Sequence, residues 1–129
     1  SAMAAALLSE GEGGAVDGLL DNAASGKVEL VVPALFWFEI GNVLVLAERK
    51  GRIPNGDAAR LEALLLALPI RTDAPPAPGT VARIRSWAQQ HNLTYYDAAY
   101  PELAERLKAR LKTLDEDLLR LKRMLSWID

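Results

Sequence analysis

The sequence contains no cysteine and only one histidine, His91, which excludes disulfide bonds and thiolate metal ligands. Any metal ion would have to be bound by oxygen atoms or by that imidazole, and carboxylate oxygens favour hard cations such as Mg²⁺ or Mn²⁺. No serine stands in a Gly-x-Ser-x-Gly turn, and the Gly-rich run GEGG at Gly11–Gly14 lacks the Lys-Ser/Thr of a phosphate-binding loop. The chain therefore offers no familiar protein nucleophile.

The chain also lacks a strong excess of positive charge and a long hydrophobic run. Its formal net charge is −2, which argues against a dedicated nucleic-acid binder but less against a nuclease, whose bound cations add positive charge. The apolar run Ala4–Leu8 is short and has no basic flank, and the stretch Leu30–Leu46 is interrupted by Pro33, Glu39 and Asn42. We therefore expect a soluble, cytoplasmic protein that does not contact a membrane.

What is present is typical of a globular protein. Half of the 129 residues are hydrophobic and a quarter are charged, which fits a single domain over residues 1–129. Hydrophobic periodicity and Gly/Pro breaks predict an α/β order of elements. The expected elements are a helix over 1–20 with a Gly-rich turn, a strand over 27–32, helices over 34–49 and from about 57 to 68, a short strand over 70–72, a helix over 80–90 and a further helix that Asp97 enters. Asn55 or Asp57 is expected to cap the helix that ends near residue 68. One side of that helix carries Leu61, Leu64, Leu65 and Leu68.

The last third of the chain is ambiguous. Its leucines are spaced three or four residues apart, which by periodicity alone predicts one long helix from Glu102 to Trp127. The heptads are too few to establish a coiled coil. The leucines of this series are Leu103, Leu107, Leu111, Leu114, Leu118, Leu121 and Leu125.

Glu39 is the first candidate functional residue. It lies in the run PALFWFEIGNVL, where its helical neighbours include Phe36, Asn42 and Val43. A carboxylate on the apolar side of a helix needs compensation, because burying an unpaired charge costs several kcal/mol. A divalent cation would supply it, and so would a hydrogen bond to Asn42 or a side chain that reaches an edge.

Asp97 is the second candidate, in the run LTYYDAAY. Two aromatic residues precede it and two alanines follow, so it enters a helix with a small, packed first turn. The alternative is structural: Thr94 caps this helix with Asp97 at the third position, and the carboxylate serves only the backbone.

Asp115 and Asp117 complete the set, in the run KTLDEDLL. Taken alone, these two residues could form the N-terminal cap of a final helix or belong to a solvated surface. Several carboxylates that converge from different elements, however, cannot all ionise without cations nearby. Such clusters support metal-dependent phosphodiester cleavage, in which a bound ion activates water and no protein nucleophile is needed.

At this point the sequence resembles a known family. The motifs Pro33-x-x-x-x-x-Glu39-x-x-Asn42 and Thr94-x-Tyr96-Asp97-Ala98-x-Tyr100, followed by TLDEDLL, are similar to those of PIN-domain ribonucleases, above all the VapC-type toxins of bacterial toxin–antitoxin pairs. The resemblance covers nearly the whole chain. It implies a helix-rich α/β fold with a small parallel sheet flanked by helices, a carboxylate cluster that binds Mg²⁺ or Mn²⁺, endonucleolytic cleavage of RNA, a homodimer, and neutralisation by a cognate antitoxin peptide.

The resemblance also implies roles for individual residues. Glu39, Asp97 and Asp115 would be the catalytic, metal-binding acids, with Asp117 the second choice for the last position. Asn42 and Ser1 would be supporting polar groups.

Three features depart from the family pattern. The family's first strand, which ends in Asp-x-Ser-Ala, is not seen, since the sequence begins Ser1-Ala2-Met3-Ala4. Either that strand is absent, or residues 1–3 are a cloning remnant around a native Met3; both leave the sheet without its central strand and the site without one acid. Pro101 predicts a kink or a late helix start near Asp97. The weakly apolar run 110–112 favours extension of the helix, and a final strand over 126–129 is barely visible.

Three functions follow from these features. The first is a metal-dependent endoribonuclease toxin that cleaves RNA with metal-activated water. The second is a catalytically impaired PIN-like domain that only binds its antitoxin or another protein. The third is a mostly helical interaction module that uses the leucine series.

Overall fold

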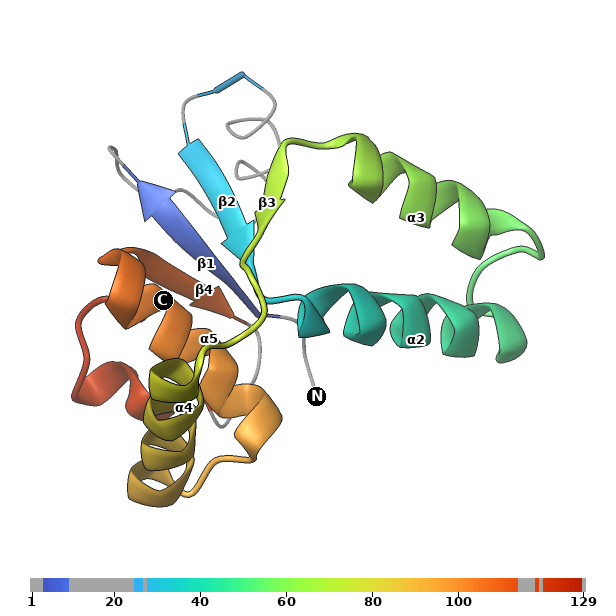
Figure 1. Cartoon of the computed structure of the whole chain (residues 1–129). Coiled ribbons are helices and arrows are strands. Elements are labelled where there is room, and N and C mark those ends of the chain that lie inside the picture. The colour runs from blue at the N-terminus through green and yellow to red at the C-terminus, as the bar shows by residue number, and fades with distance from the viewer. Residues whose placement is uncertain (1–3, 10–24, 27, 114–117, 119, 129) are drawn as a thin grey trace.

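The computed structural model describes residues 4–9, 25–26, 28–113, 118 and 120–128 (Figure 1). It is a helix-rich α/β structure, as the sequence predicts. The elements in chain order are β1 (Ala4–Ser9), β2 (Val28–Val32), α2 (Leu35–Arg49), α3 (Asp57–Ala67), β3 (Ile70–Thr72), α4 (Pro78–His91), α5 (Tyr95–Leu107), β4 (Arg110–Thr113) and the 3₁₀ turn η1 (Arg120–Arg123).

The four strands form one sheet in the order β3-β2-β1-β4. β2 and β3 are parallel, with Leu30 opposite Ile70, whereas β1 is antiparallel to both of its neighbours. Because β2 and β4 each run opposite to β1, they run in the same direction as one another. The carboxyl ends of β2, β3 and β4 therefore lie at one edge of the sheet, where β1 begins.

The core lies between this sheet and the helix pair α4–α5. β2 is buried at four of its five positions, as expected for a strand covered on both faces. α5 packs against β1, β4 and α4, and has the largest set of buried residues of any described helix (Figure 1). Ile84 and Trp87 are the buried residues of α4, and Leu111 of β4 is fully buried. The candidate carboxylate Asp97 is thereby placed on the best-packed helix.

The hairpin of α2 and α3 extends away from the sheet (Figure 1). α3 packs against α2 and has no fully buried residue, but Leu65 of the predicted leucine stripe packs against the core as a partly buried side chain. The cap expected from Asn55 or Asp57 is also wrong: the N-cap is Gly56, with φ of +91°. Glu48 at the end of α2 replaces the missing cap, because its Oε2 accepts a hydrogen bond from the Ala58 N–H at 3.0 Å.

The helix expected over residues 1–20 is wrong where the structure describes this segment. Residues 4–9 form β1, which pairs with β2 on one side and β4 on the other. Local helix propensity of an Ala/Leu run is outweighed here by the backbone hydrogen bonds that two neighbouring strands offer. The expectation that the sheet lacks its central strand is not confirmed, since β1 lies at that position.

The long helix expected from Glu102 to Trp127 is also wrong. α5 ends at Leu107, and Lys108 adopts a left-handed conformation with φ of +53°. The chain then pairs with β1 as β4, and Ile128 forms an isolated parallel bridge with Leu111. Some of the described leucines of this series are buried in one core, but they come from separate parts of the chain. These leucines are Leu103, Leu111, Leu118 and Leu121.

Pro101 predicts a kink or a late helix start near Asp97, and the observed helix starts two residues before Asp97. α5 begins at Tyr95 and continues through Pro101, which is buried. Because proline has no N–H, the Asp97 carbonyl receives no helical hydrogen bond from position 101. The other predicted elements, at 27–32, 34–49, 70–72 and 80–90, are confirmed with small shifts of their ends.

Candidate functional site

The first candidate acid, Glu39, is positioned by the chain that leaves β2. Pro33 follows the strand, and its carbonyl accepts a hydrogen bond from the Phe36 N–H at 2.9 Å, at the start of α2. Phe36 and Ile40 are the buried residues of this helix and fix its rotation. Glu39 lies between them and is half-buried.

The second candidate acid, Asp97, is positioned by the helix cap at the start of α5. Thr94 is the N-cap, and its Oγ1 accepts a hydrogen bond from the Asp97 N–H at 3.0 Å. The capping interaction that the sequence suggests is therefore confirmed for the backbone. The Asp97 residue is only 7% exposed, and its place in the first turn favours a negative charge.

Tyr100 joins these two acids. Its hydroxyl donates a hydrogen bond to Glu39 Oε1 at 2.5 Å, and the residue is 1% exposed. The pKa of Tyr100 is raised far above its usual value, first by burial, then by the hydrogen bond to Glu39 and by the negative charges of Glu39 and Asp97. The carboxylates of α2 and α5 therefore act on one buried phenol.

This environment predicts a dependence of stability on alkaline pH. In the unfolded chain Tyr100 ionises near its usual pKa of about 10, whereas in the folded protein the neutral form is favoured. The stabilisation is thus complete below about pH 10, and above it the free energy of unfolding should fall by about 1.4 kcal/mol per pH unit from this group. Urea unfolding of metal-free protein on both sides of that pH should show this slope in the wild type, and a slope smaller by that amount in Tyr100→Phe. Equal slopes for the two proteins would contradict the buried environment of Tyr100.

Of the remaining predicted site residues, the structure describes only Asn42. Asn42 is exposed, one turn beyond Glu39 on α2. Asp115, Asp117 and Ser1 lie outside the described residues; Asp115 follows the end of β4 by two positions in sequence. Within the described part of the chain, no group of three or more His, Asp or Glu side chains is placed to hold a metal ion. Glu39 and Asp97 thus supply oxygen ligands of the type that Mg²⁺ and Mn²⁺ prefer, but form only part of a full set.

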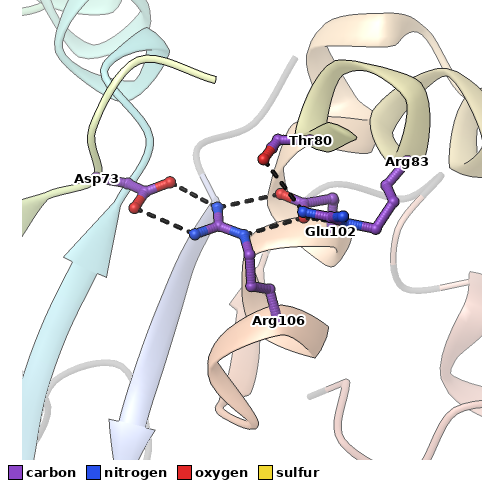
Figure 2. Close-up of polar contacts among 5 residues, drawn as sticks. All are labelled: Asp73, Thr80, Arg83, Glu102 and Arg106. Carbon is purple, nitrogen blue, oxygen red and sulfur yellow. Dashed lines mark hydrogen bonds and ion pairs between the residues drawn. The ribbon is translucent and has the colours of Figure 1, made fainter. Parts of the chain in front are cut away.

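A network of charged side chains connects α4, α5 and the loop after β3 (Figure 2). The Arg106 guanidinium bridges two carboxylates, donating to Asp73 Oδ2 at 2.6 Å and to Glu102 Oε2 at 3.0 Å. Arg83 also donates to Glu102, at 3.2 Å, and to the Thr80 hydroxyl, at 3.1 Å. The hydrogen bonds to Asp73 and Glu102 raise the pKa of Arg106 further above its usual value. The network ties the loop after β3 to α4 and α5.

This network could not be predicted as a whole from the sequence. Glu102 and Arg106 are four residues apart on one helix, a spacing that favours an ion pair and could have been noticed. No local pattern, however, indicates that Glu102 is only 2% exposed or that Asp73 approaches from a loop.

Beside the network is a pocket of about 210 Å³ between the start of α2, the loop after β3 and the first turns of α5. Its wall is mostly apolar, and two partly exposed rings, Tyr95 and Tyr96, contribute to it. Asp73, Glu102 and Arg106 close it on one side.

Among the described residues, none of the helices has both the length and the apolar character needed to span a membrane.

The comparisons with known proteins bear on the same residues. Among curated proteins no match is found. Residues 1–124 match the PIN domain, a family whose members are typically nucleases and generally use divalent metal ions. The match includes both acids beside Tyr100 and all four strands of the sheet. The chain belongs to the PIN-domain family.

Proposed function

We propose that this protein is a metal-dependent endoribonuclease of the VapC toxin type, acting on RNA in the cytoplasm. The observation that carries the proposal is that α2 and α5 bring Glu39 and Asp97 to one buried phenol, Tyr100. Two carboxylates that act on one phenol supply oxygen ligands of the kind that Mg²⁺ and Mn²⁺ prefer, and a bound cation would lower the repulsion between them. Asp115, or Asp117 in its place, would complete the ligand set from the segment that follows β4.

The chemistry of this set fits phosphodiester cleavage. A divalent cation supplies, when bound, an activated water and neutralisation of the charge that develops on the phosphate. The role of Glu39 and Asp97 is to bind and orient that cation from two different helices. In the described part of the chain, the exposed rings of Tyr95 and Tyr96 offer a surface on which unpaired bases can stack, which suits a single-stranded RNA substrate.

The toxin assignment includes two protein partners, an antitoxin peptide and a second copy of the chain. The α2–α3 hairpin supports a protein partner, because it presents large apolar side chains to solvent. Phe38 is 78% exposed, and the others on this hairpin are Val43, Val45, Leu64 and Leu66.

Cleavage of a labelled single-stranded RNA tests the proposal. With Mn²⁺ in millimolar excess, the wild type should cleave the RNA, and a chelator should stop the reaction. Glu39→Gln keeps the size of the side chain but removes a ligand charge, so the rate should fall by at least about a hundredfold. The matched control is Glu29→Gln, because Glu29 is an exposed glutamate of β2 that pairs with Arg71 at 2.7 Å. This variant should cleave at the wild-type rate.

A second candidate function is a catalytically impaired domain that only binds a protein. It is favoured by the observation that the described residues bring together two acids and not three. Absence of Mn²⁺-dependent cleavage by the wild type would contradict the nuclease and support this alternative. Cleavage that survives in Glu39→Gln would contradict the assigned site.

A further inference from the structure

Tyr100 has a hydroxyl in a place where packing alone does not require one. The residue is 1% exposed, its ring lies in the hydrophobic core, and a phenylalanine ring would fill nearly the same space. The hydroxyl group is the only difference between the two side chains. Its O–H on α5 donates a hydrogen bond to Glu39 Oε1 on α2. A buried hydroxyl needs an acceptor, and here the acceptor is a carboxylate proposed to bind a cation.

The position of Tyr100 on α5 also places it beside Asp97. Tyr100 follows Asp97 by three residues, so the two side chains lie on the same face of the helix. Asp97 contributes to the electrostatic environment of the Tyr100 hydroxyl, while Glu39 accepts its hydrogen bond. One phenol thus relates an acid on its own helix to an acid on another helix.

We infer that Tyr100 is a positioning residue, whose hydroxyl holds the Glu39 carboxylate in the orientation in which it binds the divalent cation together with Asp97. The inference rests on the proposed function. Carboxylates that bind metals are themselves usually held by hydrogen bonds from neighbouring groups, and removal of such a group typically weakens metal binding or activity by about 10- to 100-fold. The hydrogen bond to Oε1 limits rotation of the Glu39 carboxylate before the cation binds. Less conformational entropy is therefore lost when the cation binds.

The affinity for Mn²⁺, measured from the electron paramagnetic resonance signal of the free ion, tests the inference. Tyr100→Phe should weaken Mn²⁺ binding by roughly tenfold or more. Glu29→Gln is the control, because it changes an exposed glutamate of β2 that pairs with Arg71, and it should bind Mn²⁺ as the wild type does. Glu39→Gln and Asp97→Asn should each weaken binding at least as much as Tyr100→Phe.

The outcomes separate the two proposals. If Glu39→Gln and Asp97→Asn weaken Mn²⁺ binding and Tyr100→Phe does not, the positioning role is wrong and the proposed metal site stands. If none of the three variants changes the affinity, the proposed site fails, and the inference fails with it.

A spectroscopic measurement on the unsubstituted chain covers the case in which Tyr100→Phe does not fold. The sequence has three tyrosines, so protein labelled with 3-fluorotyrosine should give three ¹⁹F resonances. Addition of Mg²⁺ should shift the resonance of the buried tyrosine, identified by its protection from solvent, and leave the two exposed ones in place. A buried resonance that does not respond to saturating Mg²⁺ would overturn the inference, because a purely structural hydroxyl would behave in that way.

Discussion

Replacing Arg106 with methionine should lower the free energy of unfolding by about 3 to 5 kcal/mol. The variant keeps an unbranched side chain in α5 but removes the cation that bridges Asp73 and Glu102. Glu102 is 2% exposed and, among the described residues, would keep its hydrogen bond from Arg83, whose own side chain is half exposed. Leaving a buried charge without its main partner is costly, because burial removes much of the water that would solvate it.

Urea unfolding at neutral pH measures this loss. Arg60→Met is the matched control, since Arg60 pairs with Asp57 at 3.1 Å on an exposed helix surface and its loss should cost less than about 1 kcal/mol. The double variant Arg106→Met with Glu102→Leu should be more stable than Arg106→Met alone, because the buried charge is then removed as well. If Arg106→Met loses no more than Arg60→Met does, the network does not hold the loop after β3 in place.

Replacing Leu111 with alanine should lower the free energy of unfolding by about 3 kcal/mol or more, in line with other buried leucines. Leu111 is 0% exposed, lies in β4 opposite Ala6 of β1, and its N–H donates to the Trp127 carbonyl at 2.8 Å. Truncation of its side chain therefore leaves a cavity at the junction of the sheet, α5 and the C-terminal segment. For a chain of 129 residues this corresponds to a fall in Tm of roughly 10 °C.

The matched control is Leu66→Ala in α3, where the leucine is 63% exposed. Its truncation should cost less than about 1 kcal/mol, since little apolar surface is buried there. Thermal melting and urea unfolding of the two variants side by side check the difference. Similar losses at both positions would contradict the burial of β4 and favour the solvent-exposed helix that leucine spacing suggests.

Elements that depend on local pattern could be predicted from the sequence. β2 is a β-branched run between Gly26 and Pro33, and α2 is an apolar run that ends at Arg49, shortly before Gly51. For such segments the same residues determine both the element and its burial. The PIN fold could therefore be recognised from residue patterns alone, and the family match confirms it.

Elements that depend on distant partners could not be predicted in this way. β1 is an Ala/Leu run with high helix propensity, and β4 has leucine spacing that fits a helix equally well. β1 is a strand because β2 and β4 offer backbone donors and acceptors on its two sides, and β4 is a strand because β1 offers them on one side. Propensity is a weak signal in comparison with a sheet that needs its hydrogen bonds paired.

The candidate site shows the same division. Glu39 and Asp97 could be singled out because a carboxylate on an apolar helix face is chemically unusual. The hydrogen bond between Tyr100 and Glu39 could not be predicted, because the two residues are 61 positions apart in the sequence. Asp115 and Asp117 remain predictions from the family motif. The Asp73–Arg106–Glu102 network joins residues 33 positions apart and has no sequence signature except the spacing of Glu102 and Arg106.

The pairing of β1 with β4 also has a consequence for the order of folding. Ala4 lies opposite Thr113, so the strand at the centre of the sheet acquires one of its two neighbours only after residues 110–113 have been synthesised. Contacts so far apart in sequence slow folding, because the entropy of closing a long loop is lost before the contact forms. The α2–α3 hairpin, by contrast, needs only local contacts and can form early. Until β4 arrives, one edge of β1 is unpaired, and during synthesis this edge is open to pairing with another molecule.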